Sequence, residues 1–299
     1  MCGIVGLFLK DRALEGDLGR LTAEMLVILS DRGPDSAGFA VYGAAGDGTA
    51  KLTLRVPDAM DPAALGAALT AALGCPVSAL VRGDHVVATV AAAQEAALRA
   101  VLARGFPEIG IVSAGARMEL YKGVGLPDAV SHRYGLPGMS GTHAIGHTRM
   151  ATESAVTTQG AHPFSTGPDQ CLVHNGSLSN HNAVRRTLKR EGLTFETEND
   201  SEVAAGYLTW RMRQGASLGD ALTAAVSDLD GFYTFVVGTE NGFGVLRDPI
   251  ACKPAVMAET EDYVAFGSEY RALVPLPGIE RARLFEPAPG QVYFWERAA

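Results

Sequence analysis

The N-terminal part of the chain alternates short apolar runs with segments of helical spacing. The apolar, glycine-punctuated run at 2–8 predicts a buried strand. A helix is predicted from a cap at Asp17 to about Ser30. Its inner face would consist of Leu18, Leu21, Met25, Ile28 and Leu29. The strings FAVYG and KLTLRV then look like a pair of strands, and the string RGPDSAG between the helix and this pair is typical of a turn.

Residues 58–115 have a different character. Two alanine-rich helical patterns alternate here with the strand-like strings PVSALV, HVVATV and IGIVSAG. This order predicts a compact α/β subdomain inserted into a larger fold. The uncharged run from Pro62 to Val81 has the length of a membrane span, but it holds two prolines and is mostly alanine and glycine. A buried helix followed by a strand is the better interpretation.

The rest of the chain predicts a strand ending in polar residues at THAIGHTRMAT, three helices between 181 and 229, and a row of short strands towards the end. Because these strands cluster apart from the helices, the pattern favours layers of an α+β fold over a doubly wound parallel sheet.

Composition narrows the class of protein. The chain has 299 residues, 47% of them hydrophobic and 19% charged, which is typical of a globular protein with a large core. The formal net charge of −8 argues against nucleic-acid or anionic-membrane partners. The four cysteines lie far apart, which argues against both a zinc knuckle and a disulfide framework. With no signal peptide at the start of the sequence, we expect a protein of the reducing cytoplasm.

Cys2 is a candidate nucleophile. Removal of Met1, which a small second residue generally permits, would leave a free α-amine a few ångströms from the Cys2 thiol. The reference pKa of such an amine is about 7.7–8.0 and that of the thiol is about 8.5, so the amine can take the thiol proton near neutral pH. A small residue at position two is also common by accident, so position alone does not decide the role of Cys2.

Six short sequence motifs, the first of which contains Cys2, bear on its role. They are CGIVG at 2–6, RGPDSAG at 32–38, GHTRMAT at 146–152, AHPF at 161–164, HNGSLSN at 174–180 and NDSE at 199–202. In this order the set resembles the class II, or N-terminal nucleophile, glutamine amidotransferases. The resemblance covers most of the chain apart from the insertion. It implies a four-layer αββα sandwich over 2–299, with the α/β subdomain at 58–115 inserted within it.

The resemblance also implies the reaction, the hydrolysis of L-glutamine to L-glutamate and ammonia through a thioester on Cys2. Asn175 and Gly176 would form the oxyanion hole, for which a side-chain amide and a backbone N–H are suitable donors. Taken alone, an Asn-Gly pair is more often a hairpin turn.

Recognition of free glutamine requires groups for its α-carboxylate and α-ammonium. Arg149 and Asp200 would take these roles, with Thr152 and His162 nearby, and Arg32 would hold the terminal loop. The alternatives from the residues alone are a surface salt bridge for Arg149 and a helix N-cap for Asp200. No metal site is expected, since HAIGH at 143–147 lacks the glutamate of a zinc-binding helix.

We find no signature of a synthase domain in the chain, so the acceptor of ammonia is expected on another polypeptide. A chain of this kind looks most like the glutaminase subunit of glutamate synthase-like assemblies such as N-methylglutamate synthase. In these a partner carries FMN and an iron–sulfur cluster, and no cofactor is expected on this chain. γ-Glutamylmethylamide could then replace glutamine and release methylamine. The alternatives are another N-terminal nucleophile amidase and a catalytically silent assembly or amino-acid-binding subunit, which would result if Met1 is retained.

Overall fold

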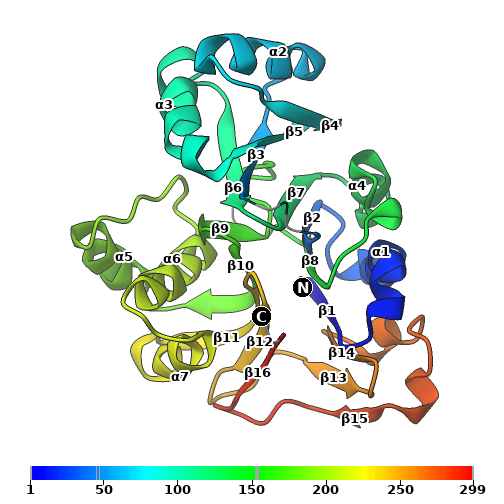
Figure 1. The fold of residues 1–299 in the computed structure, drawn as a ribbon. Coiled ribbons are helices and arrows are strands. Elements are labelled where there is room, and N and C mark those ends of the chain that lie inside the picture. Colours follow the sequence, from blue (N-terminus) through cyan, green and yellow to red (C-terminus); the bar gives the residue numbers. More distant parts are fainter. Residues whose placement is uncertain (1, 45, 47, 152–154, 298–299) are drawn as a thin grey trace.

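The computed structural model describes residues 2–44, 46, 48–151 and 155–297. It has an α+β fold with two large antiparallel sheets and a smaller third one (Figure 1). The first sheet has the strand order β15-β13-β14-β1-β8-β2-β7. Its strands are β1 (Gly3–Leu9), β2 (Ser36–Tyr42), β7 (Met118–Val124), β8 (His143–Arg149), β13 (Val256–Glu259), β14 (Tyr263–Gly267) and β15 (Arg283–Phe285).

The second sheet has the order β16-β12-β11-β10-β9. Its strands are β9 (Phe164–Gly167), β10 (Gln170–Leu178), β11 (Gly231–Gly238), β12 (Gly242–Arg247) and β16 (Val292–Glu296). The helices of this half are α5 (His181–Arg190), α6 (Asp200–Arg213) and α7 (Leu218–Asp228). All three contribute to one hydrophobic cluster with the second sheet, so they cover its outer face.

The first sheet packs on helices with one face and on the second sheet with the other. Val5, Leu7 and Leu9 of β1 belong to a cluster with α1 (Leu18–Ile28) and α4 (Pro127–Tyr134). Ile4 and Phe8 belong to the cluster between the two sheets. Successive side chains of a strand point to opposite faces, so burial on both sides explains why β1 is an unbroken apolar run. The predicted first strand and first helix are confirmed, although Asp17 makes no side-chain cap hydrogen bond.

The third sheet, of order β4-β5-β3-β6, lies at the top of Figure 1 with two helices against it. Its elements are β3 (Thr49–Arg55), α2 (Pro62–Leu73), β4 (Ser78–Arg82), β5 (His85–Ala91), α3 (Glu95–Gly105) and β6 (Gly110–Gly115). Asp61 caps α2, Pro62 begins it, and Gly74 ends it at a φ of 74°. The helices and strands predicted between 58 and 115 are therefore present. No helix in the described ranges has the length and apolarity needed to cross a membrane.

The two strands predicted at FAVYG and KLTLRV are present, but they belong to different sheets. FAVYG lies in β2, which pairs with β7 and β8, whereas KLTLRV lies in β3, which pairs with β5 and β6. Both edges of β2 are thus occupied by strands from later in the chain, and β3 joins the third sheet. That sheet therefore begins at Thr49, before the 58–115 range.

Asp169 ties the end of the third sheet to the rest of the molecule. This carboxylate is 5% exposed and accepts three backbone hydrogen bonds. The donors are the N–H groups of Ala116, Arg117 and Met118, at 2.6, 2.9 and 2.8 Å. These residues join β6 to β7, so the carboxylate fixes the turn at which the chain leaves the third sheet.

We expect Asp169→Ala to lower the free energy of unfolding by about 3 kcal/mol, because three N–H donors around a buried position would lose a charged acceptor. Urea denaturation measures the change. The exposed Asp58 provides the control, and Asp58→Ala should change the free energy by less than about 0.5 kcal/mol. Equal effects of the two substitutions would show that the Asp169 contacts contribute little.

Candidate active site

A pocket of about 730 Å³ opens where the first strand begins. It brings together residues from five separate parts of the chain. Of the residues expected at the site, those that line it are Cys2, Arg149, His162, Asn175, Gly176 and Asp200. Thr152 lies outside the described residues. Arg32 is not among the lining residues but touches one of them, as described below.

Cys2 directly precedes β1 and is half-buried. Its Sγ lies 3.9 Å from the carbonyl oxygen of Met150, to which the thiol donates. Its own carbonyl oxygen accepts from Arg32 Nε at 3.0 Å and from Asn175 Nδ2 at 3.3 Å. Two side chains therefore hold the Cys2 backbone while its sulfur lines the pocket.

Arg32 is itself held in place. Its Nη1 lies 2.5 Å from Glu269 Oε1, and hydrogen bonding from Arg32, with that from Arg271, lowers the pKa of the Glu269 carboxyl. Arg32 thus links the Cys2 backbone to Glu269. Glu269 is a partner that the sequence analysis missed, because it lies 237 residues away with no motif around it.

Asn175 and Gly176 lie within β10, paired with Thr234 and Tyr233 of β11. The alternative of a hairpin turn at this Asn-Gly pair is therefore wrong. Gly176 has a φ of 141°, and a Cβ there would come within 1.9 Å of the Phe232 carbonyl oxygen. Only glycine fits this position of the strand. The Asn175 amide has two N–H groups, of which one suffices for the Cys2 carbonyl.

Arg149 ends β8 and is 6% exposed, so a surface salt bridge does not describe it. The RGPDSAG segment runs against its backbone. A Cβ on Gly33 would lie 2.5 Å from the Arg149 nitrogen, which shows how closely the two chains approach. Asp35 adds two hydrogen bonds, from its N–H to the Arg149 carbonyl at 3.1 Å and from the Ala151 N–H to its carboxylate at 2.7 Å. The segment predicted as a turn thus fixes the backbone of Arg149, from which its side chain extends.

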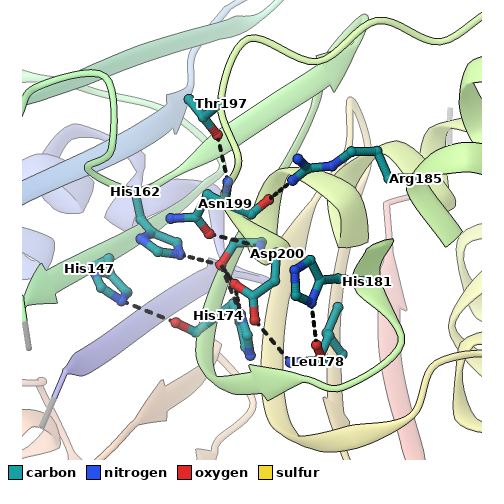
Figure 2. A network of polar contacts seen from close by, with 10 residues as sticks. His147, His162, His174, Leu178, His181, Arg185, Thr197, Asn199 and Asp200 are labelled. Atoms are coloured by element: carbon teal, nitrogen blue, oxygen red, sulfur yellow. Dashed lines mark hydrogen bonds and ion pairs between the residues drawn. The ribbon is translucent and has the colours of Figure 1, made fainter. Parts of the chain in front are cut away.

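Asp200 is the first residue of α6, and the helix is capped by Asn199, whose side chain accepts from the Ser201 N–H. The N-cap alternative for Asp200 is therefore wrong. The Asp200 carboxylate accepts from the Leu178 N–H at 2.9 Å and has its other oxygen 3.8 Å from His174 Nδ1 (Figure 2). It is a fixed negative group on the pocket wall.

Two histidine rings contact the start of α6, and a third stacks on one of them. His162 Nε2 and His174 Nδ1 each lie 2.8 Å from the Ser201 hydroxyl oxygen (Figure 2). The ring of His147 stacks on that of His162 at 4.1 Å and donates from Nε2 to the His174 carbonyl. Of these three histidines, only His162 was expected at the site. His147, His174 and Ser201 stand in the quoted strings, but nothing in those strings indicates that they meet.

Burial lowers the pKa of all three histidines, that of His147 to about 3. A fourth buried histidine, His143, has its pKa lowered to about 3 for the same reason. In an unfolded chain each would have a pKa of about 6.5. As the pH falls below that value, the unfolded chain takes up protons that the folded protein does not. Stability contributed at neutral pH is therefore lost towards pH 3.

We expect the free energy of unfolding to fall between pH 7 and pH 5, with each buried histidine adding a slope of up to about 1.4 kcal/mol per pH unit below 6.5. Urea titrations across this range measure the slope. His143→Asn should reduce it, whereas His132→Asn, at an exposed histidine, should leave it unchanged. An equal slope in the two variants would contradict the assignment of His143 as neutral and buried.

Among the described residues, no group of three or more His, Cys, Asp or Glu side chains is arranged to hold a metal ion. The pocket instead presents a thiol, a carboxamide, a guanidinium and a carboxylate. These groups can attack a carbonyl carbon, stabilise an oxyanion and bind the two charged ends of an amino acid.

Comparison with known proteins agrees with this arrangement. Residues 147–275 match the family model described as "Glutamine amidotransferase domain". The chain is 62% identical to "Glutamine amidotransferase-like protein GlxB" of Rhizobium meliloti (strain 1021), over 99% of this chain and 98% of that protein. It is 33% identical to a "Putative glutamine amidotransferase" of Methanothermobacter thermautotrophicus, over 99% of this chain and 100% of that protein.

The fold is also found among solved structures. The glutamine phosphoribosylpyrophosphate amidotransferase of B. subtilis matches 99% of this chain with 47% of its own, at a TM-score of 0.62 and 20% identity. At that identity the likeness concerns the fold, and it agrees with the predicted α+β class. The extent and identity of the sequence matches decide the family: this chain belongs to the class II glutamine amidotransferases.

Proposed function

We propose that the protein hydrolyses the side-chain amide of L-glutamine, with Cys2 as the nucleophile. The observation that carries the proposal is that Cys2, Asn175, Arg149 and Asp200 line one pocket although they come from four separate parts of the chain. Removal of Met1 would free the α-amine of Cys2 to act as the base.

In the first half of the reaction, the amine takes the thiol proton and the sulfur attacks the amide carbon. Asn175 Nδ2 and the Gly176 N–H stabilise the negative oxygen of the tetrahedral intermediate. When this collapses, the amine returns the proton to the leaving nitrogen, and ammonia departs. Water, deprotonated by the same amine, then attacks the γ-glutamyl thioester and releases glutamate and the thiol.

The two ends of the amino acid are bound by opposite charges. Arg149 pairs with the α-carboxylate, since a guanidinium can bind a carboxylate through two hydrogen bonds. Asp200 pairs with the α-ammonium, for which its position on the pocket wall is suitable. The proposal includes the αββα order of layers, supported by the apolar cluster between the large sheets and the helix clusters on their outer faces.

We further propose that the released ammonia, or methylamine from γ-glutamylmethylamide, passes to a separate synthase subunit in the cytoplasm. A glutamate synthase-like or N-methylglutamate synthase partner with FMN and an iron–sulfur cluster would fit this role. Support is limited to the similarity to GlxB, which is described as glutamine amidotransferase-like, since an amidotransferase passes the nitrogen of glutamine to an acceptor. Copurification of a flavin-containing partner with the tagged protein tests this part.

Incubation with 6-diazo-5-oxo-L-norleucine followed by peptide mass mapping tests the central proposal. We expect label on Cys2, an intact mass that lacks one methionine, and release of ammonia from free glutamine. Arg149→Ala should lose most of the affinity for glutamine. No label at saturating reagent would favour a silent binding subunit, and cleavage of other amides without cleavage of glutamine would favour a different N-terminal nucleophile amidase.

A further inference from the structure

A buried lysine holds the loop that forms one wall of the pocket. Lys122 lies on β7 and is 8% exposed. Its Nζ donates to the carbonyl oxygens of Gln159, Ala161 and Pro163, at 3.1, 2.9 and 3.4 Å. An ammonium has three N–H donors, so these three carbonyls use all of them.

The loop 159–163 borders two cavities at Gln159. Gln159 and His162 line the active-site pocket, and Gln159 also lines a second cleft of about 790 Å³ between the third sheet and α6. Ala161 and His162 are buried, whereas Gln159 is exposed, so Lys122 holds the packed part of the loop through its backbone carbonyls. Lys122 itself lines the second cleft, and the Phe164 ring lies 4.5 Å from its ammonium.

The charges around Lys122 explain how a cation can be kept there. Burial, with a smaller contribution from Arg55, lowers the pKa of Lys122 to about 8, while Glu202 and Glu196 act in the opposite direction. Glu202 is fixed by the N–H groups of Glu196 and Thr197, both at 2.8 Å. Burying this charge is unfavourable by itself, so the three carbonyl bonds and the two carboxylates are what make the arrangement possible.

The loop reaches two groups that act on the substrate. His162 contacts Ser201 at 2.8 Å, next to Asp200. On the other side, a Cβ placed on Gly160 would lie 3.8 Å from Arg149 Nη1. A shift of the loop would therefore move the wall between the groups proposed for the two charged ends of glutamine.

We propose that Lys122 is a positioning residue for substrate binding, which acts by holding the loop 159–163 against Arg149 and the start of α6. The proposal rests on the glutaminase function proposed above. Lys122 touches no reacting atom, so its loss should weaken binding of glutamine and spare the chemistry at Cys2.

The test compares Lys122→Met with Lys51→Met. Lys51 is a half-buried lysine on neighbouring β3 whose ammonium pairs with Glu119 at 3.0 Å, away from the loop. In Lys122→Met we expect the KM for glutamine to rise about tenfold with kcat within about twofold of wild type, as for a loss of ground-state and transition-state binding together. Hydrogen exchange of the amides of Gly160, Ala161 and His162 should become about tenfold faster. Lys51→Met should change neither quantity.

Unchanged KM together with unchanged hydrogen exchange would overturn the proposal, as would a fall in kcat at constant KM. If the Met variant does not fold, Lys122→Gln, which is polar but cannot span the three carbonyls, replaces it with the same expected results. Failure of the wild-type protein to release ammonia or take the label on Cys2 would instead refute the glutaminase function. The exchange experiment distinguishes the two failures, because it reports on the loop without substrate.

Discussion

Replacement of Cys2 by alanine is expected to lower kcat/KM for glutamine by at least about 10³-fold, to the limit of detection. The thioester cannot form without the sulfur. Serine at the same position should be nearly as inactive, because the pKa of its hydroxyl lies far above that of the α-amine that would have to deprotonate it. Ammonia release from glutamine measures the loss, and 6-diazo-5-oxo-L-norleucine should no longer label the first peptide.

Cys75 provides the matched control for this experiment. It is also a free, half-buried cysteine, but it lies in the loop after α2, distant in the sequence from every lining residue of the pocket. Cys75→Ser should retain activity and label. Residual activity above about one tenth of wild type in Cys2→Ala would remove the sulfur from the mechanism and leave the pocket as a binding site.

The second large effect is expected at Asn175. Asn175→Ala should lower kcat about 10²- to 10³-fold with a small change in KM, because a donor to the oxyanion acts in the transition state. Asn175→Asp keeps the shape and places a negative charge beside the developing oxyanion, so it should be at least as damaging. Steady-state kinetics with glutamine measure both.

Asn175 also donates to the Cys2 carbonyl, so thermal unfolding must be measured beside kinetics. Asn180 provides the control, since its amide donates to the Asp228 carbonyl at the end of α7. Asn180→Ala should leave kcat unchanged. A large rise in KM for Asn175→Ala at constant kcat would assign the amide to substrate binding and leave the oxyanion hole without its side-chain donor.

The local sequence pattern predicted a helix or strand correctly where its position depends on residues within or next to it. The caps and the glycine that bound α2 are adjacent to the helix, and β1 is apolar because both of its faces are buried. Strand pairing was a poorer guide, as β3 shows. FAVYG and KLTLRV are both strands, but the edges of β2 are occupied by β7 and β8, so β3 pairs elsewhere. The Asn-Gly pair was similar, since a dipeptide that favours turns lies inside a long strand here.

The order of the short strings along the chain indicated the family, and the same strings contain residues that line the pocket. Their relations in space came from the tertiary structure alone. Ser201 meets His162 and His174 across 39 and 27 residues, and Lys122 meets its loop across about 40. Such contacts depend on how the two sheets and their helices pack. A local sequence pattern cannot predict which residues far apart in the chain come together. The residues available for chemistry were thus determined by the sequence, and the partners that hold them in position were decided by the fold.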